Sequence, residues 1–223
     1  TGLVGIEIVT ETDREIVAKS LLDPAEISLG GTIDQLRQIS LSMHERAVEA
    51  VLEVDNAELA EHVISRDDDA DRLFALVSRQ LYRALTDVRQ IDKLQTSRRM
   101  AFTQFRTARQ LERIADHAEL IADIATRQSD PPPAALGETF ESVATDARRV
   151  VRTALDGNTG EALLRRDDVI DRLDELDREL YKSHSDDSYL YGRVLESFRR
   201  TAEYGGNIAE IRTLADLAET QRL

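Results

Sequence analysis

The sequence contains no cysteine and no tryptophan, and glycine, proline and aromatic residues are scarce among its 223 positions. Without cysteine the chain can form neither a disulfide nor a thiolate metal site. No run of eighteen apolar residues is present, so no membrane-spanning segment is expected, and no secretory signal opens the sequence. Leu, Ala, Arg, Asp and Glu dominate what remains, and this composition is typical of an all-α protein.

The net charge of the chain is strongly negative. The chain has 43 acidic and 29 basic residues, a formal net charge of −14, and only three of the basic residues are lysines. An acidic surface poor in lysine indicates adaptation to high salt, as in a halophile, where self-repulsion is screened. The same surface repels phosphate groups, so direct nucleic-acid binding by this chain is not expected.

The hydrophobic pattern changes near Gly30-Gly31. Before it, residues 1–29 contain alternating apolar residues and a β-branched run at Ile16-Val17, which predict two short strands in a β segment or linker. After it, helical periodicity predicts six helices, with breaks rich in Asp, Asn, Ser, Gly or Pro. The expected helices are 32–54, 57–86, 96–127, 135–156, 159–184 and 189–220.

The helical part contains an internal repeat. RDDDADRL at 66–73 recurs as RDDVIDRL at 166–173, with identity at six of eight positions. ERIADHAEL at 112–120 is echoed more weakly by EYGGNIAEI at 203–211. Because a single three-helix unit would leave an apolar face exposed, two tandem units explain the repeat economically.

We therefore predict an all-α protein of two tandem three-helix bundles behind a short N-terminal β element. The proline run at 131–133 is the strongest break in the chain, and it falls between the two copies of the repeat. The expected units are residues 30–130 and 134–223.

Paired carboxylates recur within the repeat. Residues four apart on a helix share one face. Each unit has one such pair on its second helix and one on its third, where Asn207 replaces an acid in the second unit. Four like charges brought together need a cation or must take up protons, and a hard divalent metal with oxygen ligands relieves the repulsion. The candidate ligands are Asp67, Asp71, Glu112 and Asp116 in the first unit, and Asp167, Asp171, Glu203 and Asn207 in the second. The alternative is a pair of solvated faces on an acidic protein.

Other residues near these pairs qualify the prediction. Glu119 and Asp123 continue the stripe of the first unit, and we assign them to solvent or to the edge of the cluster. An amide is a weak ligand, so Asn207 predicts weaker binding, or none, in the second unit. Small residues, Ala115 and Gly205-Gly206, predict the close approach of a neighbouring helix or a ligand.

LERIADHAELIADIA at 111–125, combined with the twofold repeat and the acid-x-x-x-Asp pairs, resembles the PhoU family of phosphate-uptake regulators. The resemblance covers about residues 32–220. It implies two three-helix bundles side by side and, in many members, iron or zinc clusters held by the paired motifs, which by position are the eight residues named above. On ligand softness alone, oxygen-only sites favour Mg²⁺, Mn²⁺ or Ca²⁺.

The resemblance also implies a role. Members act as non-enzymatic adaptors in the cytoplasm that restrain a phosphate ABC transporter, here expected through its ATPase subunit, and a linked phosphate-sensing histidine kinase. Some archaeal relatives carry an AbrB-like DNA-binding domain ahead of the bundles, and residues 1–29 resemble the linking segment. A homodimer is also expected, because long bundle faces readily self-associate.

Two other classes of protein stay open. One is an enzyme that uses a carboxylate-bound metal for hydrolysis or oxidation, and the other is a structural helical dimer. The sequence lacks the Glu-x-x-His, P-loop and HExxH motifs. Arginines on the acid-bearing helices, including Arg109 and Arg199-Arg200, are expected to form intrahelical ion pairs rather than to bind phosphate.

Overall fold

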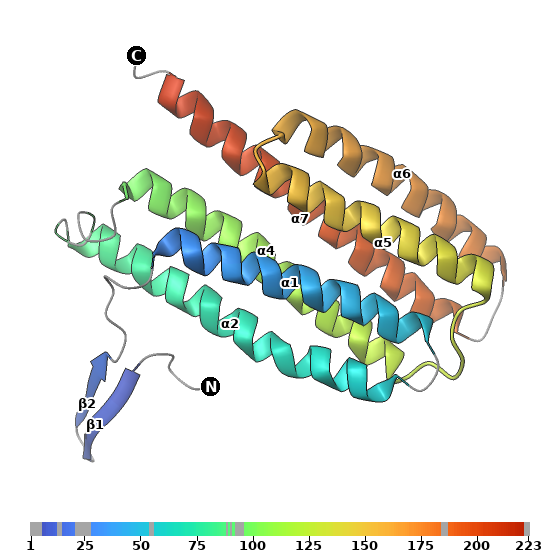
Figure 1. Cartoon of the computed structure of the whole chain (residues 1–223), viewed down its shortest axis with the longest axis horizontal. Helices are drawn as coiled ribbons and strands as arrows, with labels where there is room; N and C mark the ends of the chain where they lie inside the picture. Colours follow the sequence, from blue (N-terminus) through green and yellow to red (C-terminus); the bar gives the residue numbers. More distant parts are fainter. Residues whose placement is uncertain are drawn as a thin grey trace.

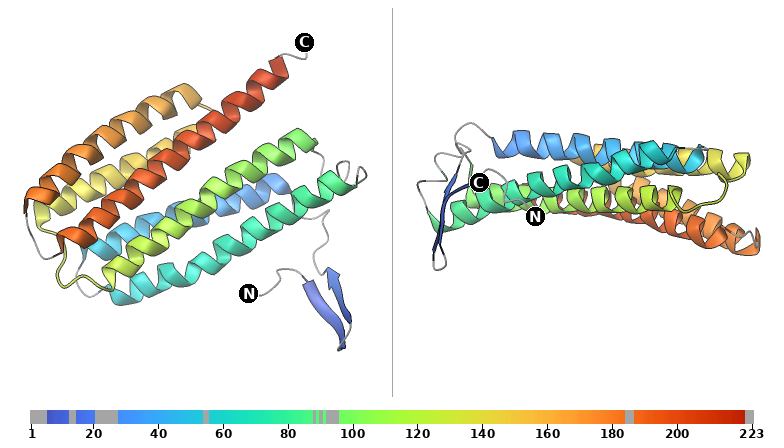
Figure 2. Two further views of the ribbon diagram at one scale, coloured as in Figure 1. Left: turned by 180° about the vertical axis from the view of Figure 1, so that it is seen from behind. Right: turned by 90° about the horizontal axis from the view of Figure 1, so that it is seen from below.

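Six helices make up the described part of the chain beyond residue 28, and they form two three-helix bundles side by side (Figures 1 and 2). The first bundle contains α1 (Leu29–Leu52), α2 (Ala57–Thr86) and α4 (Arg98–Ala125). The second contains α5 (Ala134–Leu155), α6 (Thr159–Ser183) and α7 (Ser188–Thr220). The computed structural model describes residues 6–12, 15–20, 28–53, 56–87, 89, 91, 96–183 and 187–220. The predicted all-α pair of three-helix bundles is confirmed.

The N-terminal region contains two strands, β1 (Ile6–Thr12) and β2 (Glu15–Ser20). They pair antiparallel, with a register irregularity between Ile8 and Thr10. Residues 1–5, 13–14 and 21–27 of the predicted N-terminal segment lie outside the described residues.

Local capping sets where the helices begin. The Ser28 hydroxyl accepts a hydrogen bond from Gly31 N at 3.0 Å, so α1 starts three residues before the predicted position. Ser97 caps α4 in the same way through Met100 N at 3.0 Å. Gly157, at φ +93°, follows α5 in the left-handed conformation that glycine tolerates best.

Helix α4 lies at the centre of the molecule. It packs against α1 and α2 within its own bundle and against α7 of the other bundle, as the view from behind shows (Figure 2). Its inward side chains are fully buried and mostly small or β-branched, including Ile114, Ala115, Ala118 and Ile121. Small side chains let neighbouring helices approach closely, so α4 can contact three helices at once.

A second contact between the bundles joins α1 to α5. His44 is fully buried there, and its Nδ1 lies 3.2 Å from Arg148 Nη1. Because a guanidinium only donates, Nδ1 accepts this hydrogen bond and the imidazole is held in its neutral form. No helix among the described residues combines the length and the apolar character needed to cross a membrane.

Candidate metal centre

Three of the predicted first-unit ligands converge between α2 and α4. Asp67 and Asp71 lie one turn apart on α2, and Asp116 faces them from α4. One carboxylate oxygen of each residue lies within 4.8 Å of the other two. The three residues therefore form a cluster, which we call the acidic triad.

Glu112 lies one turn before Asp116 on the same helix and is buried, with 7% of its surface exposed. Its Oε1 accepts a hydrogen bond from Arg109 Nη1 at 2.8 Å, while its Oε2 is buried without a hydrogen-bond partner. Burial, followed by the charge of Asp116, raises the pKa of Glu112 to about 7, although Arg109 acts in the opposite direction. Arg109 therefore occupies one carboxylate oxygen of Glu112, and the other oxygen, Oε2, is available to a second cation.

The triad carboxylates also repel one another. The pKa of Asp67 rises to about 6, first because of burial and then because of Glu119, Asp116 and Asp71. Burial and Asp71 likewise raise the pKa of Asp116. Asp67 Oδ1 is buried without a hydrogen-bond partner. Such groups are costly to keep charged unless a cation or protons compensate them.

The next two acids of the α4 stripe differ from each other. Burial, followed by the charge of Asp116, raises the pKa of Glu119, and Glu119 in turn contributes to the shift of Asp67. Glu119 therefore belongs electrostatically to the edge of the triad. Asp123, one turn later, instead forms an ion pair with Arg127 at 3.2 Å on the exposed side of the helix.

The geometry suits an oxygen-ligated cation. Metal–oxygen distances are about 2.0–2.6 Å, so two oxygens on one ion lie at most about 5 Å apart. The 4.8 Å spread of the triad oxygens falls within this limit. His117, next to Asp116, is not positioned to join them, because its ring nitrogens lie 3.3 Å from Ser197 Oγ and 3.4 Å from Tyr204 Oη on α7.

Three of the four corresponding residues of the second unit already have hydrogen-bond partners. Asp167 accepts a hydrogen bond from Arg166 Nε at 2.9 Å, and Glu203 accepts one from Arg200 at 2.9 Å. Asn207 donates to Gln110 Oε1 on α4 at 3.0 Å. Among the described residues, the carboxylates of Asp167, Asp171 and Glu203 do not meet within the distance that joins the acidic triad.

An arginine supplies positive charge to the second unit. Arg166 Nη1 lies 3.5 Å from Glu210 of α7, in addition to the contact with Asp167. A Cβ at Gly206 would stand only 2.6 Å from Arg166 Cδ, so the absence of a side chain at Gly206 makes room for Arg166. The first unit has Ala115 at the matching position of α4, and Arg66 there lies 3.3 Å from Asp69 on its own helix.

The predicted intrahelical ion pairs are confirmed for Arg109 and Arg200. Sequence reasoning missed that Arg109 also lies over the Phe74 ring of α2, with 5.1 Å between its Cζ and the ring centroid. This contact fixes the guanidinium that holds Glu112. In the sequence, the three-residue spacing of Arg109 and Glu112 on one helix is the feature that indicates their ion pair.

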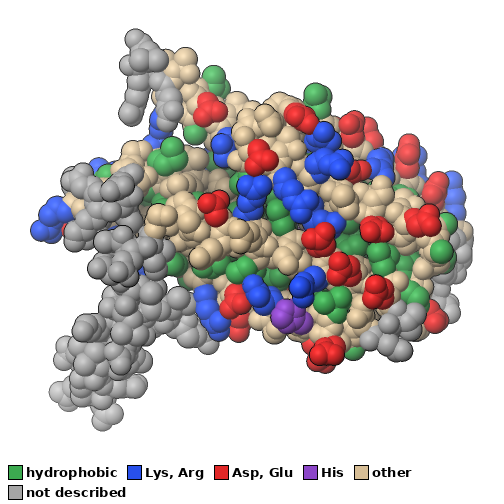
Figure 3. Space-filling model, in the orientation of Figure 1, with side chains coloured by type: hydrophobic (Ala, Val, Ile, Leu, Met, Phe, Trp, Pro, Cys, Tyr) green, Lys and Arg blue, Asp and Glu red, His purple; other side chains and the backbone are tan. Residues whose placement is uncertain are grey.

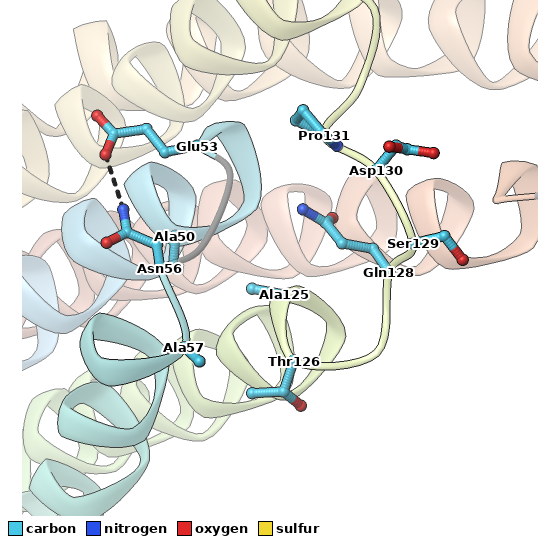
Figure 4. Close-up of a pocket in the computed structure, with 10 residues that line it drawn as sticks. All are labelled: Ala50, Glu53, Asn56, Ala57, Ala125, Thr126, Gln128, Ser129, Asp130 and Pro131. Carbon is cyan, nitrogen blue, oxygen red and sulfur yellow. Dashed lines mark hydrogen bonds between the residues drawn. The ribbon is translucent and has the colours of Figure 1, made fainter.

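A cavity of about 200 Å³ lies where the α1–α2 and α4–α5 connections meet (Figure 4). Gln128 donates to the carbonyl of Val51 at 2.8 Å, and Asn56 donates to Glu53 at 2.8 Å. In Figure 4 the carboxylates of Glu53 and Asp130 point away from each other, so this cavity does not gather ligands for a cation.

Comparison with known proteins links the first bundle to a described family. The model of the PhoU domain matches residues 33–125, a range that spans nearly all of α1, α2 and α4 and includes the acidic triad. Residues 33–125 are therefore similar to a PhoU domain. The resemblance predicted from the third-helix motif is thus confirmed for the first unit.

Known PhoU structures share the fold over most of the chain. The phosphate transport system regulatory protein PhoU from Streptococcus pneumoniae matches with a TM-score of 0.65 and 19% identity, covering 82% of this chain and 91% of that one. PhoU from Pseudomonas aeruginosa matches with a TM-score of 0.67 and 19% identity, covering 82% and 93%. No curated protein matches the sequence. At this identity the two structures establish the fold of both bundles.

Proposed function

We propose that this protein is a regulator of phosphate uptake and of phosphate-dependent signalling. The observation that carries the proposal is the PhoU domain at 33–125, within a chain that has the two-bundle fold of PhoU proteins. One of the similar structures is named as the regulatory protein of a phosphate transport system. The proposed role is non-enzymatic and is exerted in the cytoplasm.

The proposed partner is a phosphate ABC transporter, contacted through its ATPase subunit, with a phosphate-sensing histidine kinase as the second partner. A homodimer is the proposed assembly. The strongly acidic surface supports binding to proteins rather than to nucleic acid. We also propose that residues 1–29 correspond to the segment that links the bundles to an AbrB-like DNA-binding domain in archaeal, halophilic relatives. The two proposed bundle domains are residues 30–130 and 134–223.

We propose further that Asp67, Asp71 and Asp116, together with Glu112, hold a metal ion. Support comes from the convergence of the triad and from the buried, unpartnered oxygens of Asp67 and Glu112. Iron or zinc is favoured by the family resemblance, and Mg²⁺, Mn²⁺ or Ca²⁺ by the oxygen ligands. A bound ion would neutralise the repulsion between α2 and α4.

The second set, Asp167, Asp171, Glu203 and Asn207, is proposed as the weaker metal site. Arg166 already provides positive charge beside Asp167 and Glu210. Asn207 contributes no charge, and its amide is bonded to Gln110. A cation therefore gains less electrostatic energy here than at the acidic triad.

The regulatory proposal is tested in the native organism by deleting the gene and measuring phosphate uptake at low and high external phosphate. We expect the deletion strain to continue rapid uptake at high phosphate, and wild-type protein to restore repression. Phosphate-responsive transport that does not change after deletion would refute the regulator. Metal-dependent phosphoester hydrolysis by pure protein, abolished by Asp116→Ala, would establish the enzyme instead.

A further inference from the structure

A small groove between α1 and α2 is lined by hydrogen-bond donors and contains no acidic side chain. Its volume is about 80 Å³. Ser42 and Arg46 line it from α1, and His62 and Arg66 line it from α2. We call these four residues the basic groove. In a chain with 43 acids and 29 bases, a lining free of carboxylates is an exception to the surrounding surface.

The helical spacing explains why the four side chains converge. Ser42 and Arg46 are four residues apart on α1, and His62 and Arg66 are four apart on α2, so each pair occupies one face of its helix. The two helices pack against each other within the first bundle. Figure 3 shows basic side chains and a histidine over α1 and α2, with acidic side chains interspersed among them.

The charge of the basic groove is only partly compensated. Arg66 lies 3.3 Å from Asp69, but Asp69 also pairs with Arg72 at 3.1 Å. Arg46 forms no ion pair or hydrogen bond with another described side chain. The acid next to it, Glu45, lies 3.9 Å from Arg148 and therefore points toward α5.

The floor of the groove is apolar. Met43 and Val63 lie beneath it and are 3% and 1% exposed, respectively. Above this floor the side chains of Ser42, Arg46 and His62 are exposed, so an ion can reach them from solvent and form charge-assisted hydrogen bonds. Two guanidinium groups, a hydroxyl and an imidazole approach from two sides, and this arrangement suits an ion with several acceptor oxygens.

We propose that the basic groove binds a tetrahedral oxyanion, with inorganic phosphate as its ligand. Arg46 and Arg66 provide the charge and paired donors, and Ser42 and His62 provide single donors. The volume accommodates a free phosphate ion and leaves no enclosed space for a nucleoside. This site goes beyond the regulatory function proposed above and does not depend on it.

Phosphate binding by the full-length protein is measured by isothermal titration calorimetry at low ionic strength with a chelator present. We expect one saturable site per chain, competition by sulfate, and weaker binding of AMP. Hydrogen bonds to charged groups contribute enough that Arg46→Gln and Arg66→Gln should each weaken binding by about tenfold or more. Arg83→Gln changes the net charge equally on the same helix, outside the groove and away from Asp69, and it should change the affinity less than about twofold.

Three outcomes would overturn the proposal. The first is no saturable binding at millimolar phosphate, and the second is an equal loss of affinity in Arg46→Gln and Arg83→Gln. The third is loss of binding in Asp67→Ala/Asp116→Ala with no loss in Arg46→Gln. The last result would place the anion on a metal at the acidic triad. Regulation of phosphate uptake is tested separately in cells. A negative result for phosphate binding by the groove can therefore be distinguished from a negative result for the regulatory function.

Discussion

Gly205 of α7 lies so close to Val150 of α5 that a Cβ at Gly205 would stand 2.8 Å from Val150 Cγ1 and 2.9 Å from the backbone nitrogen of Val151. The neighbouring residue, Gly206, instead faces the flexible side chain of Arg166. Two adjacent glycines therefore serve different purposes. The first lets two helices meet, and the second makes room for a cationic side chain.

Gly205→Ala should lower the free energy of unfolding by about 1–3 kcal/mol, because the backbone of α5 cannot move aside locally. Gly206→Ala is the matched control. Arg166 can swing toward solvent there, and alanine gains helix propensity of about 1 kcal/mol over glycine, so little net change is expected. Urea unfolding followed by circular dichroism measures both. Equal destabilisation by the two substitutions would contradict the assigned roles.

Removing triad carboxylates should remove bound metal. In Asp67→Ala/Asp116→Ala the metal affinity should fall by at least about tenfold, because two charged ligands of the proposed ion are lost. Asp123→Asn is the control, since Asp123 belongs to the same stripe but pairs with Arg127. Elemental analysis of gently purified protein, followed by metal titration, gives the comparison. Full metal content in the double variant would refute the site.

Glu112→Gln should have opposite effects without and with metal. In metal-free protein at pH 8 the substitution removes a buried charge that is repelled by Asp116, so the free energy of unfolding should rise by about 1 kcal/mol. In metal-saturated protein the same substitution should reduce the stabilisation that the metal provides. Thermal unfolding with chelator and with added metal tests both signs. A variant less stable than wild type under both conditions would argue against charge repulsion.

Stability should fall in mildly acidic solution because of His44. Burial, followed by the charge of Arg148, lowers the pKa of His44 well below the ordinary value of 6.5. Between the unfolded and folded pKa values, the unfolded chain binds a proton that the folded chain excludes. The contribution of His44 is thus complete above about pH 6.5 and is lost progressively below it.

The test compares wild type with His44→Gln in denaturant unfolding from pH 8 to pH 5. The difference in unfolding free energy between the two should shrink, or reverse, as the pH falls below 6.5. A difference that stays constant across this range would show that His44 does not contribute to the acid sensitivity. At pH 8 the difference in unfolding free energy reports only the loss of packing and of the hydrogen bond with Arg148.

The sequence by itself determined the helices, their number in the described region and their grouping into two bundles. Apolar periodicity and capping are local properties, and the 66–73 and 166–173 repeat shows two equivalent units. It also determined that Asp67 shares a face with Asp71, and Glu112 with Asp116, because a four-residue spacing sets a helix face regardless of what packs against it.

Only the tertiary structure decided which faces meet. Asp67 and Asp116 converge because α2 packs on α4, and no local pattern encodes that pairing. In the second unit the same spacing yields a different outcome, since Arg166 reaches across to Glu210 over a residue without a side chain. The physical reason is the sequence separation over which each interaction acts. Helix formation depends on residues within a few positions of one another, whereas charge compensation depends on side chains brought together by packing across the bundle.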